Sequence, residues 1–207
     1  MDDLVERVRR LHHGRRRTVL GLCGPPGAGK SSLAERLVGR LGADAVVVPL
    51  DGFHLHDTEL ARLGRLERKG APDTFDVDGY VALLRRIGQD PDRTVYAPAF
   101  DRDRELSLAG AIPVLPEHRI VVTEGNYLLL DTPGWREVPA ELAECWFLDG
   151  DDDRRRRRLV ERHVGHGRSP EAAEAWVATT DDPNARLVQS TREAADLVVE
   201  AAAWMTG

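Results

Sequence analysis

One glycine-rich segment constrains the fold of this chain more than any other feature of its sequence. The segment matches the pattern G-x-x-x-x-G-K-[ST] and reads Gly24-Pro25-Pro26-Gly27-Ala28-Gly29-Lys30-Ser31. Glycines let successive backbone N–H groups point into one concavity that binds anionic oxygens, and the positive end of a following helix strengthens it. Lys30 can reach the β- and γ-phosphates of a nucleotide, and the Ser31 hydroxyl can ligate Mg²⁺. The segment predicts a nucleotide-binding loop, in which we include the neighbouring Ser32.

The segments on either side of the loop fit this prediction. The apolar run 18–23 is typical of a buried strand, and residues 31–41 place apolar side chains along one side of a helix. We also expect strands at 45–50, 119–123, 144–148 and 195–199, a small hairpin within 94–112, and helices near the N-terminus and at 77–87, 151–163 and 170–180. Strands that alternate with helices predict an α/β protein. We expect one domain, residues 1–207, with the three-layer α/β/α P-loop NTPase fold, a mostly parallel five-stranded sheet and a helical lid.

Composition narrows the partners and the location. Apolar residues make up 42% of the 207 residues and the formal net charge is −6. Such a globular chain does not attract nucleic acid or anionic lipid over its whole surface. No apolar run approaches the length of a membrane span, and the acidic start is unlike a signal peptide, so we expect a cytoplasmic protein. Cys23 and Cys145 have no metal-type spacing and lie in apolar runs, which predicts two buried core thiols.

Two carboxylates follow predicted strands and are candidates for chemistry. Glu124 ends the run 119–124, and Asp51 follows the run 45–50. In an open α/β sheet, ligands collect at the carboxyl ends of the strands, so both side chains face the same crevice as the loop. We expect Glu124 to hold Mg²⁺, directly or through water, and Asp51 to accept the proton of an attacking hydroxyl. The alternative for Glu124 is a surface glutamate at a strand end, and the alternative for Asp51 is that the Asp-Gly pair only starts a turn.

Several segments resemble one group of P-loop kinases. Besides the glycine-rich loop, the matching segments are Asp51-Gly52-Phe53-His54, Arg68-Lys69-Gly70-Ala71-Pro72-Asp73-Thr74-Phe75-Asp76, Tyr96-Ala97-Pro98-Ala99-Phe100-Asp101-Arg102 and Glu124-Gly125-Asn126-Tyr127. They occur in the same order as in the group of uridine kinase, phosphoribulokinase and bacterial pantothenate kinase, and they cover most of the chain. The sequence is most similar to the branch described as nucleoside/nucleotide kinase-like or fructose-transport-system kinase-like.

The resemblance implies roles for individual residues. It makes Asp51 the catalytic base and Lys30 part of the catalytic machinery. The acceptor would be bound by residues of the matching segments, namely Asp51, His54, Arg68, Lys69, Tyr96, Arg102 and Glu124. A solvated loop histidine is the alternative for His54. The acceptor itself stays open among pantothenate, a nucleoside, a sugar and a sugar phosphate.

An arginine-rich segment, approximately residues 151–168, is the expected lid. A run of like charges repels itself along a helix, and in this group such a segment closes over the phosphates. We expect Arg158 to bind nucleotide and Arg162 to act in catalysis, because they lie one helical turn apart on the same face and can neutralise charge on the transferring phosphoryl group. Arg168 is a further candidate. The alternative, favoured for most of 154–157, is a solvated helix whose arginines pair with neighbouring acids.

The sequence as a whole predicts an ATP-dependent phosphotransferase that moves the γ-phosphate of ATP to a hydroxyl of a small metabolite, with ATP and Mg²⁺ bound at the loop. One alternative is a nucleotide kinase with a phosphate acceptor, which the basic residues Arg62, Arg65, Arg68 and Lys69 keep open. Another is a non-catalytic ATP-binding regulatory module. A GTPase-like switch is disfavoured because the guanine-reading pattern N-K-x-D is missing from the sequence. The oligomeric state stays open, with a homodimer as one option.

Overall fold

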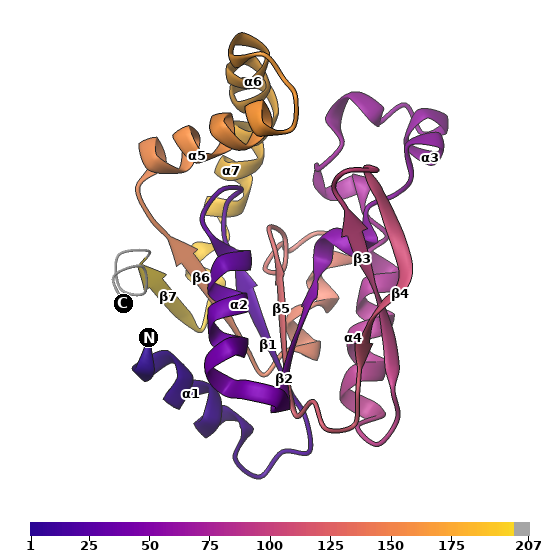
Figure 1. Ribbon diagram of the computed structural model, residues 1–207, viewed down its shortest axis with the longest axis vertical. Coiled ribbons are helices and arrows are strands. Elements are labelled where there is room, and N and C mark those ends of the chain that lie inside the picture. The colour runs from indigo at the N-terminus through magenta and orange to yellow at the C-terminus, as the bar shows by residue number, and fades with distance from the viewer. Residues whose placement is uncertain (201–207) are drawn as a thin grey trace.

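A five-stranded sheet forms the centre of the protein in the computed structural model, which describes residues 1–200 (Figure 1). Its strands are β1 (Thr18–Cys23), β2 (Ala45–Pro49), β5 (Ile120–Gly125), β6 (Glu144–Asp149) and β7 (Leu197–Glu200), in the order β2-β5-β1-β6-β7. All four pairings between neighbouring strands are parallel. The five strands expected from the sequence are therefore confirmed, and the sheet is parallel throughout.

Side chains that alternate along the strands build a separate core on each face of the sheet. On one face, Leu20 and Leu22 pack with α1 (Asp2–His12) and α2 (Lys30–Leu41). On the other face, Val19 and Cys23 pack with α4 (Val77–Gln89). This arrangement gives the expected three layers. Cys23 and Cys145 are free and buried on neighbouring strands, as predicted from their apolar surroundings.

Two groups of elements extend beyond the carboxyl ends of the strands (Figure 1). One contains α3 (Asp57–Arg62), at the upper right, and the upper end of the antiparallel hairpin of β3 (Val95–Asp101) and β4 (Leu106–Val114), which runs along the right-hand side. The other contains α5 (Asp152–Gly165), α6 (Pro170–Trp176) and α7 (Asp182–Gln189), at the upper left. The hairpin was expected from the sequence. The two groups place loops and helices on both sides of the edge at which a parallel sheet binds its ligands.

The helical segment after the sheet differs from its prediction. The helix expected at 170–180 ends as α-helix at Trp176, continues as a π-helical turn, Val177–Asp181, and leads into α7. Sequence reasoning missed α7. Pro183 lies in its first turn, where the N–H that proline lacks would have no intrahelical partner, so the proline does not end the helix. Within residues 1–200, no helix is long and apolar enough to cross a membrane.

Candidate active site

A cavity of about 1050 Å³ opens at the carboxyl ends of the strands, between the two groups of elements. It brings together most of the residues singled out in the sequence. From the loop and the strand ends it is lined by Pro26, Gly27, Gly29, Lys30, Ser31, Ser32, Asp51, His54 and Glu124, from the acceptor segments by Lys69 and Arg102, and from the arginine-rich segment by Arg158, Arg162 and Arg168. Gly24, Pro25 and Ala28 belong to the loop without lining the cavity.

The glycine-rich loop touches the arginine-rich helix directly. Gly27 has a φ of 80°, in the left-handed region that favours glycine. A Cβ atom at this position would lie 2.9 Å from Leu159 Cγ and 3.0 Å from the backbone oxygen of Arg155, both on α5. A glycine is therefore needed here both for the backbone conformation and for the close approach of α5. Gly29 is the N-cap of α2, so the helix N-terminus points its free N–H groups into the loop.

Lys30 is buried and turned back onto the loop. Its Nζ donates hydrogen bonds to the backbone oxygens of Gly24 at 2.8 Å and Pro25 at 3.1 Å, and to Asn126 Oδ1 at 2.7 Å. Burial lowers the pKa of Lys30, while Glu124 is the largest of the neighbouring charges that raise it. The three acceptors are uncharged, so phosphate oxygens in the loop would give this buried cation the anionic partner that such a site favours.

Ser31 and Glu124 meet where α2 faces the end of β5. The Ser31 hydroxyl donates a hydrogen bond of 3.0 Å to Glu124 Oε1. Burial raises the pKa of Glu124, and the nearby charge of Asp51 raises it further. A hydroxyl and a carboxylate are oxygen ligands of the kind that Mg²⁺ takes. Residues 1–200 contain no cluster of three or more His, Cys, Asp or Glu side chains for a metal, and this pair suits an ion that keeps phosphate and water ligands.

Asp51 lies in the short turn Leu50–Phe53 that follows β2, and its carboxylate faces the cavity. It accepts a hydrogen bond of 2.7 Å from Arg102, which comes from the turn between β3 and β4. The glycine of the Asp-Gly pair has its own structural reason, because a Cβ on Gly52 would lie 2.5 Å from the backbone oxygen of Pro98 on β3. The Asp-Gly sequence thus makes the turn and also presents a carboxylate to the cavity.

Arg162 extends from α5 into the cavity, close enough to Arg102 and Asp51 for their charges to affect its pKa. Burial is the main cause of its lowered pKa; the positive charge of Arg102 lowers it further, while Asp181, Asp51 and Glu124 oppose the shift. Arg168 stacks on the Trp176 ring, with its guanidinium carbon 4.0 Å from the ring centroid. The arginine-rich segment therefore contributes cationic side chains to the cavity that the glycine-rich loop also lines.

The arginine run itself is only partly solvated. Arg156 is exposed, as the alternative of a solvated helix predicts, but it pairs with Asp182 on α7 and not with an acid close to it in the sequence. Arg155 does not follow that expectation, because it is buried and bonds Asp182 Oδ1 at 2.9 Å and Asp152 Oδ1 at 2.9 Å. It also points to the backbone oxygen of Pro26 at 3.5 Å. Its spacing of four residues from the buried Leu159 is the sequence signal that could have identified it.

His54 lies at the opposite end of the cavity and is not a solvated loop residue. Its ring packs between Phe75 and Phe100, with centroid distances of 4.1 and 4.9 Å, and its Nδ1 lies 2.9 Å from the backbone oxygen of Asp51. Burial lowers the pKa of His54, which favours the neutral ring. Lys69 lies nearby and contacts Asp57.

Two expected acceptor residues do not line the cavity. Tyr96 is 62% exposed, because its neighbours Val95 and Ala97 turn into the core and alternation along β3 sends Tyr96 to the other side. Arg68 forms a short ion pair with Asp73 next to the cavity wall. Sequence reasoning also gave no separate role to Asn126, although the motif that contains it was recognised.

Comparison with known proteins places the chain in a family. No protein-family model matches it. "Putative uridine kinase C227.14" of Schizosaccharomyces pombe is 33% identical over 96% of this chain and 89% of its own length. The crystal structure titled as a putative fructose transport system kinase from Silicibacter sp. TM1040 is 41% identical, with a TM-score of 0.82 over 88% of this chain and 89% of that one.

A more distant structure shares the fold alone. YFH7 of Saccharomyces cerevisiae is 18% identical, with a TM-score of 0.83 over 96% of this chain and 98% of its own. Together with the loop and the cavity, the closer similarities show that this chain belongs to the uridine kinase-like P-loop kinases.

Proposed function

We propose that the protein transfers the γ-phosphate of ATP to a hydroxyl group of a small metabolite, with Asp51 as the base. The observation that carries this proposal is the position of the Asp51 carboxylate, which lines the same cavity as Lys30 and Glu124. A transfer site needs a cation for the phosphates, oxygen ligands for Mg²⁺ and a proton acceptor for the hydroxyl. The cavity holds one candidate for each.

The proposed roles follow from the geometry. The loop amides and Lys30 would bind the phosphates of ATP. Ser31 and Glu124 would hold Mg²⁺, whose positive charge would stabilise the charge on the phosphates. Asp51 takes the hydroxyl proton as the acceptor oxygen bonds to the γ-phosphorus, and the bond from that phosphorus to the bridging oxygen breaks to release ADP. Arg158 and Arg162, which line the same cavity, would neutralise charge on the transferring group. We propose that residues 151–168 close as a lid and exclude water.

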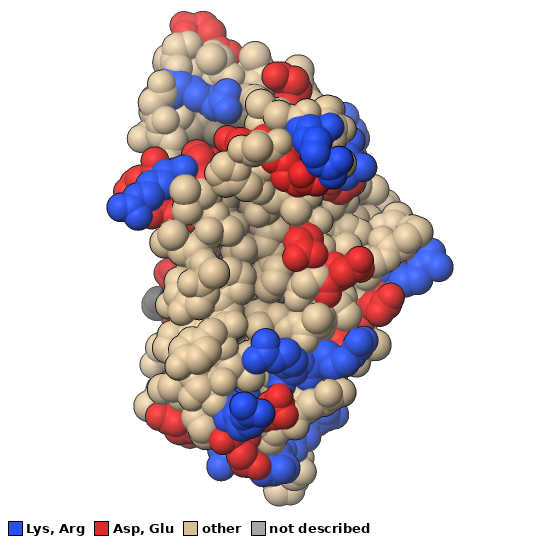
Figure 2. Space-filling model, turned by 90° about the vertical axis from the view of Figure 1, so that its right-hand side faces the viewer, with Lys and Arg blue, Asp and Glu red and all other residues tan. Residues whose placement is uncertain are grey.

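A phosphate-bearing acceptor has less support. The four basic residues that kept a nucleotide kinase open each have a carboxylate partner. Arg62 pairs with Glu59, Arg65 and Arg68 both pair with Asp73, and Lys69 pairs with Asp57. Figure 2 shows the face that carries α3, α4 and β4, where basic and acidic atoms lie next to one another instead of forming a field of one sign. Cations already neutralised in this way attract a second phosphate weakly.

The test is a coupled assay of ADP release with Mg·ATP and a panel of nucleosides, pantothenate, hexoses, pentoses and their monophosphates. Asp51→Asn should lower acceptor-dependent turnover by about 10²- to 10⁴-fold and leave the affinity for ATP unchanged, as measured by calorimetry. Asp131→Asn is the control, because the Asp131 side chain is 91% exposed and lies outside the cavity. Normal turnover of Asp51→Asn would remove the base assignment. Bound ATP without turnover of any acceptor would favour the non-catalytic module.

A further inference from the structure

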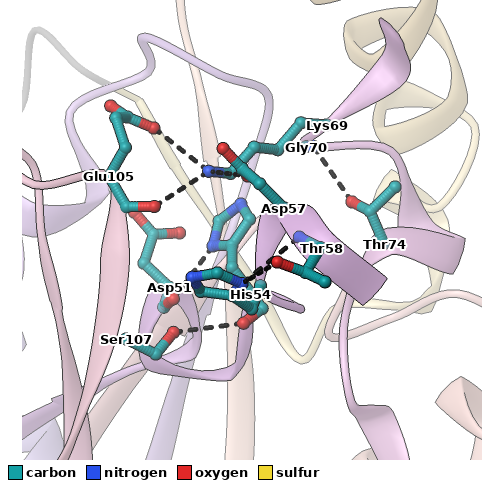
Figure 3. A network of polar contacts seen from close by, with 10 residues as sticks. Asp51, His54, Asp57, Thr58, Lys69, Gly70, Thr74, Glu105 and Ser107 are labelled. Carbon is teal, nitrogen blue, oxygen red and sulfur yellow. Dashed lines mark hydrogen bonds and ion pairs between the residues drawn. The ribbon is translucent and has the colours of Figure 1, made fainter. Parts of the chain in front are cut away.

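The part of the cavity beyond Asp51 ends in three charged side chains, Asp57, Lys69 and Glu105 (Figure 3). Lys69 comes from the segment after α3 and points between the two carboxylates, which come from α3 and from the turn between β3 and β4. Its Nζ donates to Asp57 Oδ1 at 2.7 Å and to the backbone oxygen of Glu105 at 3.0 Å, and it lies 3.4 Å from Glu105 Oε2. The Lys69 side chain is only 16% exposed.

These contacts determine which hydrogen bonds the end of the cavity offers to a ligand. An ammonium group has three donors and no acceptor, and three protein oxygens lie around Lys69 Nζ. A carboxylate has about four lone-pair sites, so Asp57 and Glu105 keep acceptor capacity after bonding Lys69. The site therefore presents acceptors, and its ligand must supply donors. Hydroxyl groups do so, whereas phosphate and carboxylate groups do not, and a ligand ammonium would be repelled by the cations of Lys69 and Arg102 in the same part of the cavity.

The charges of the cavity differ between its two ends. Around the glycine-rich loop and the arginine-rich segment, four cations face two carboxylates, namely Lys30, Arg36, Arg158 and Arg168 against Glu124 and Asp181, and Arg162 lies between this end and Asp51. At the acceptor end, three carboxylates face two cations: Asp51, Asp57 and Glu105 against Lys69 and Arg102. The first end suits the phosphates of ATP. An anionic acceptor at the other end would lie among carboxylates. Their repulsion would lower its affinity relative to an uncharged acceptor.

The wall beside the three charged residues is apolar and aromatic. Phe75, Phe100 and the ring of His54 form it, and the Lys69 ammonium lies 5.4 Å from the centroid of Phe100. The backbone oxygen of His54 accepts a hydrogen bond from Ser107 Oγ, which fixes the segment (Figure 3). A few polar groups beside apolar rings are typical of a site for a small organic molecule with C–H faces and hydroxyl edges.

We propose that the acceptor is an uncharged molecule with several hydroxyl groups, of which one lies at Asp51 and others donate hydrogen bonds to Asp57 and Glu105. This inference rests on the kinase function proposed above and adds the class of acceptor to it. Lys69 is a positioning residue: it holds the two carboxylates in place and balances part of their charge. Asp57 and Glu105 select the acceptor by accepting from its hydroxyls and by repelling anions.

The experiment compares kcat/KM across acceptors of matched carbon skeleton: an uncharged sugar or alditol, the corresponding aldonate, the monophosphate and the amino sugar. The uncharged member of the best series should exceed its charged counterparts on the order of tenfold or more. Asp51-dependent turnover that is highest with an anionic or cationic member would overturn the inference and leave the kinase standing. No Asp51-dependent turnover with any member would overturn the kinase proposal together with this inference.

Two variants test the role of the carboxylates. In Glu105→Gln and, separately, Asp57→Asn, one repelling charge disappears, while Lys69 keeps its hydrogen bond to the backbone oxygen of Glu105. The ratio of kcat/KM for the uncharged acceptor to that for its anionic counterpart should fall in both variants, chiefly through KM, with the affinity for ATP unchanged. Glu59→Gln is the matched control on α3, because Glu59 pairs with Arg62 and lies outside the cavity. Equal losses for both acceptors, with no change of the ratio, would overturn the assignment.

Discussion

Replacing Arg155 with methionine should destabilise the protein far more than the same replacement at Arg154, although both belong to one run of five arginines. The side chains of Arg155 and Asp182 are 7% and 10% exposed. Removing one partner of a buried ion pair costs about 3–5 kcal/mol, because the other charge stays buried. Asp182 keeps the exposed Arg156 as a second partner at 2.8 Å, so we expect the lower end, about 3 kcal/mol.

For a chain of this length, such a loss corresponds to a fall in Tm of about 6–12 °C. Urea denaturation and calorimetry of Arg155→Met measure it. Arg154→Met is the control, since Arg154 is exposed and surface changes stay within about 0.5 kcal/mol. The double variant Arg155→Met with Asp182→Leu should recover most of the loss, because two apolar partners leave no buried charge. If Arg155→Met is no less stable than Arg154→Met, the argument that Arg155 ties α5 to α7 and to the loop is refuted.

Three further substitutions test separate parts of the site. Glu124→Gln should be more stable than the wild type above the ordinary glutamate pKa, and the difference in Tm between the two proteins should grow as pH rises. The reason is that burial raises the pKa of Glu124, so its ionisation costs the folded state free energy. A difference in Tm that shrinks with rising pH contradicts this. Gly27→Ala should lower the free energy of unfolding by about 1–2 kcal/mol through its left-handed backbone alone. The new Cβ would also lie 3.0 Å from the Arg155 backbone oxygen, and ATP binding should weaken. Gly39→Ala is the control and should be stabilising in the same denaturation assay, because Gly39 lies inside α2 with open space around it. Tyr96→Ala should leave kcat and KM for the acceptor unchanged, because Tyr96 points away from the cavity; a raised KM would return it to the site.

Much of the fold was predictable because its signals are local. The apolar run of β1, the glycines after it and the amphipathic pattern of α2 lie next to one another in the sequence, and each reflects backbone preferences over a few residues. The parallel sheet followed from the alternation of strands and helices. The π-helical turn before α7 was not predictable, since it has no periodic signature and its buried Asp181 bonds His163, 18 residues earlier.

The site was predictable to a different degree at its two ends. The loop end depends on one contiguous motif, and Lys30 and Ser31, which the motif predicts to act together, both line the cavity. The acceptor end draws on residues from separate loops, and there the sequence named Lys69 and Arg102 but also Tyr96, which alternation along β3 turns outward. It did not name Asp57 or Glu105, because nothing in their neighbouring sequence marks them.

The sequence by itself determined the glycine-rich loop, the α/β class and the carboxylates at the ends of β2 and β5, because these follow from backbone geometry and hydrophobic periodicity over short stretches. Only the tertiary structure decided which arginine of the run is buried, and that Lys69 lies between Asp57 and Glu105, which are 12 and 36 residues away from it. The physical reason is that ion pairing and desolvation depend on distances in space, and these distances exist only once the chain has packed.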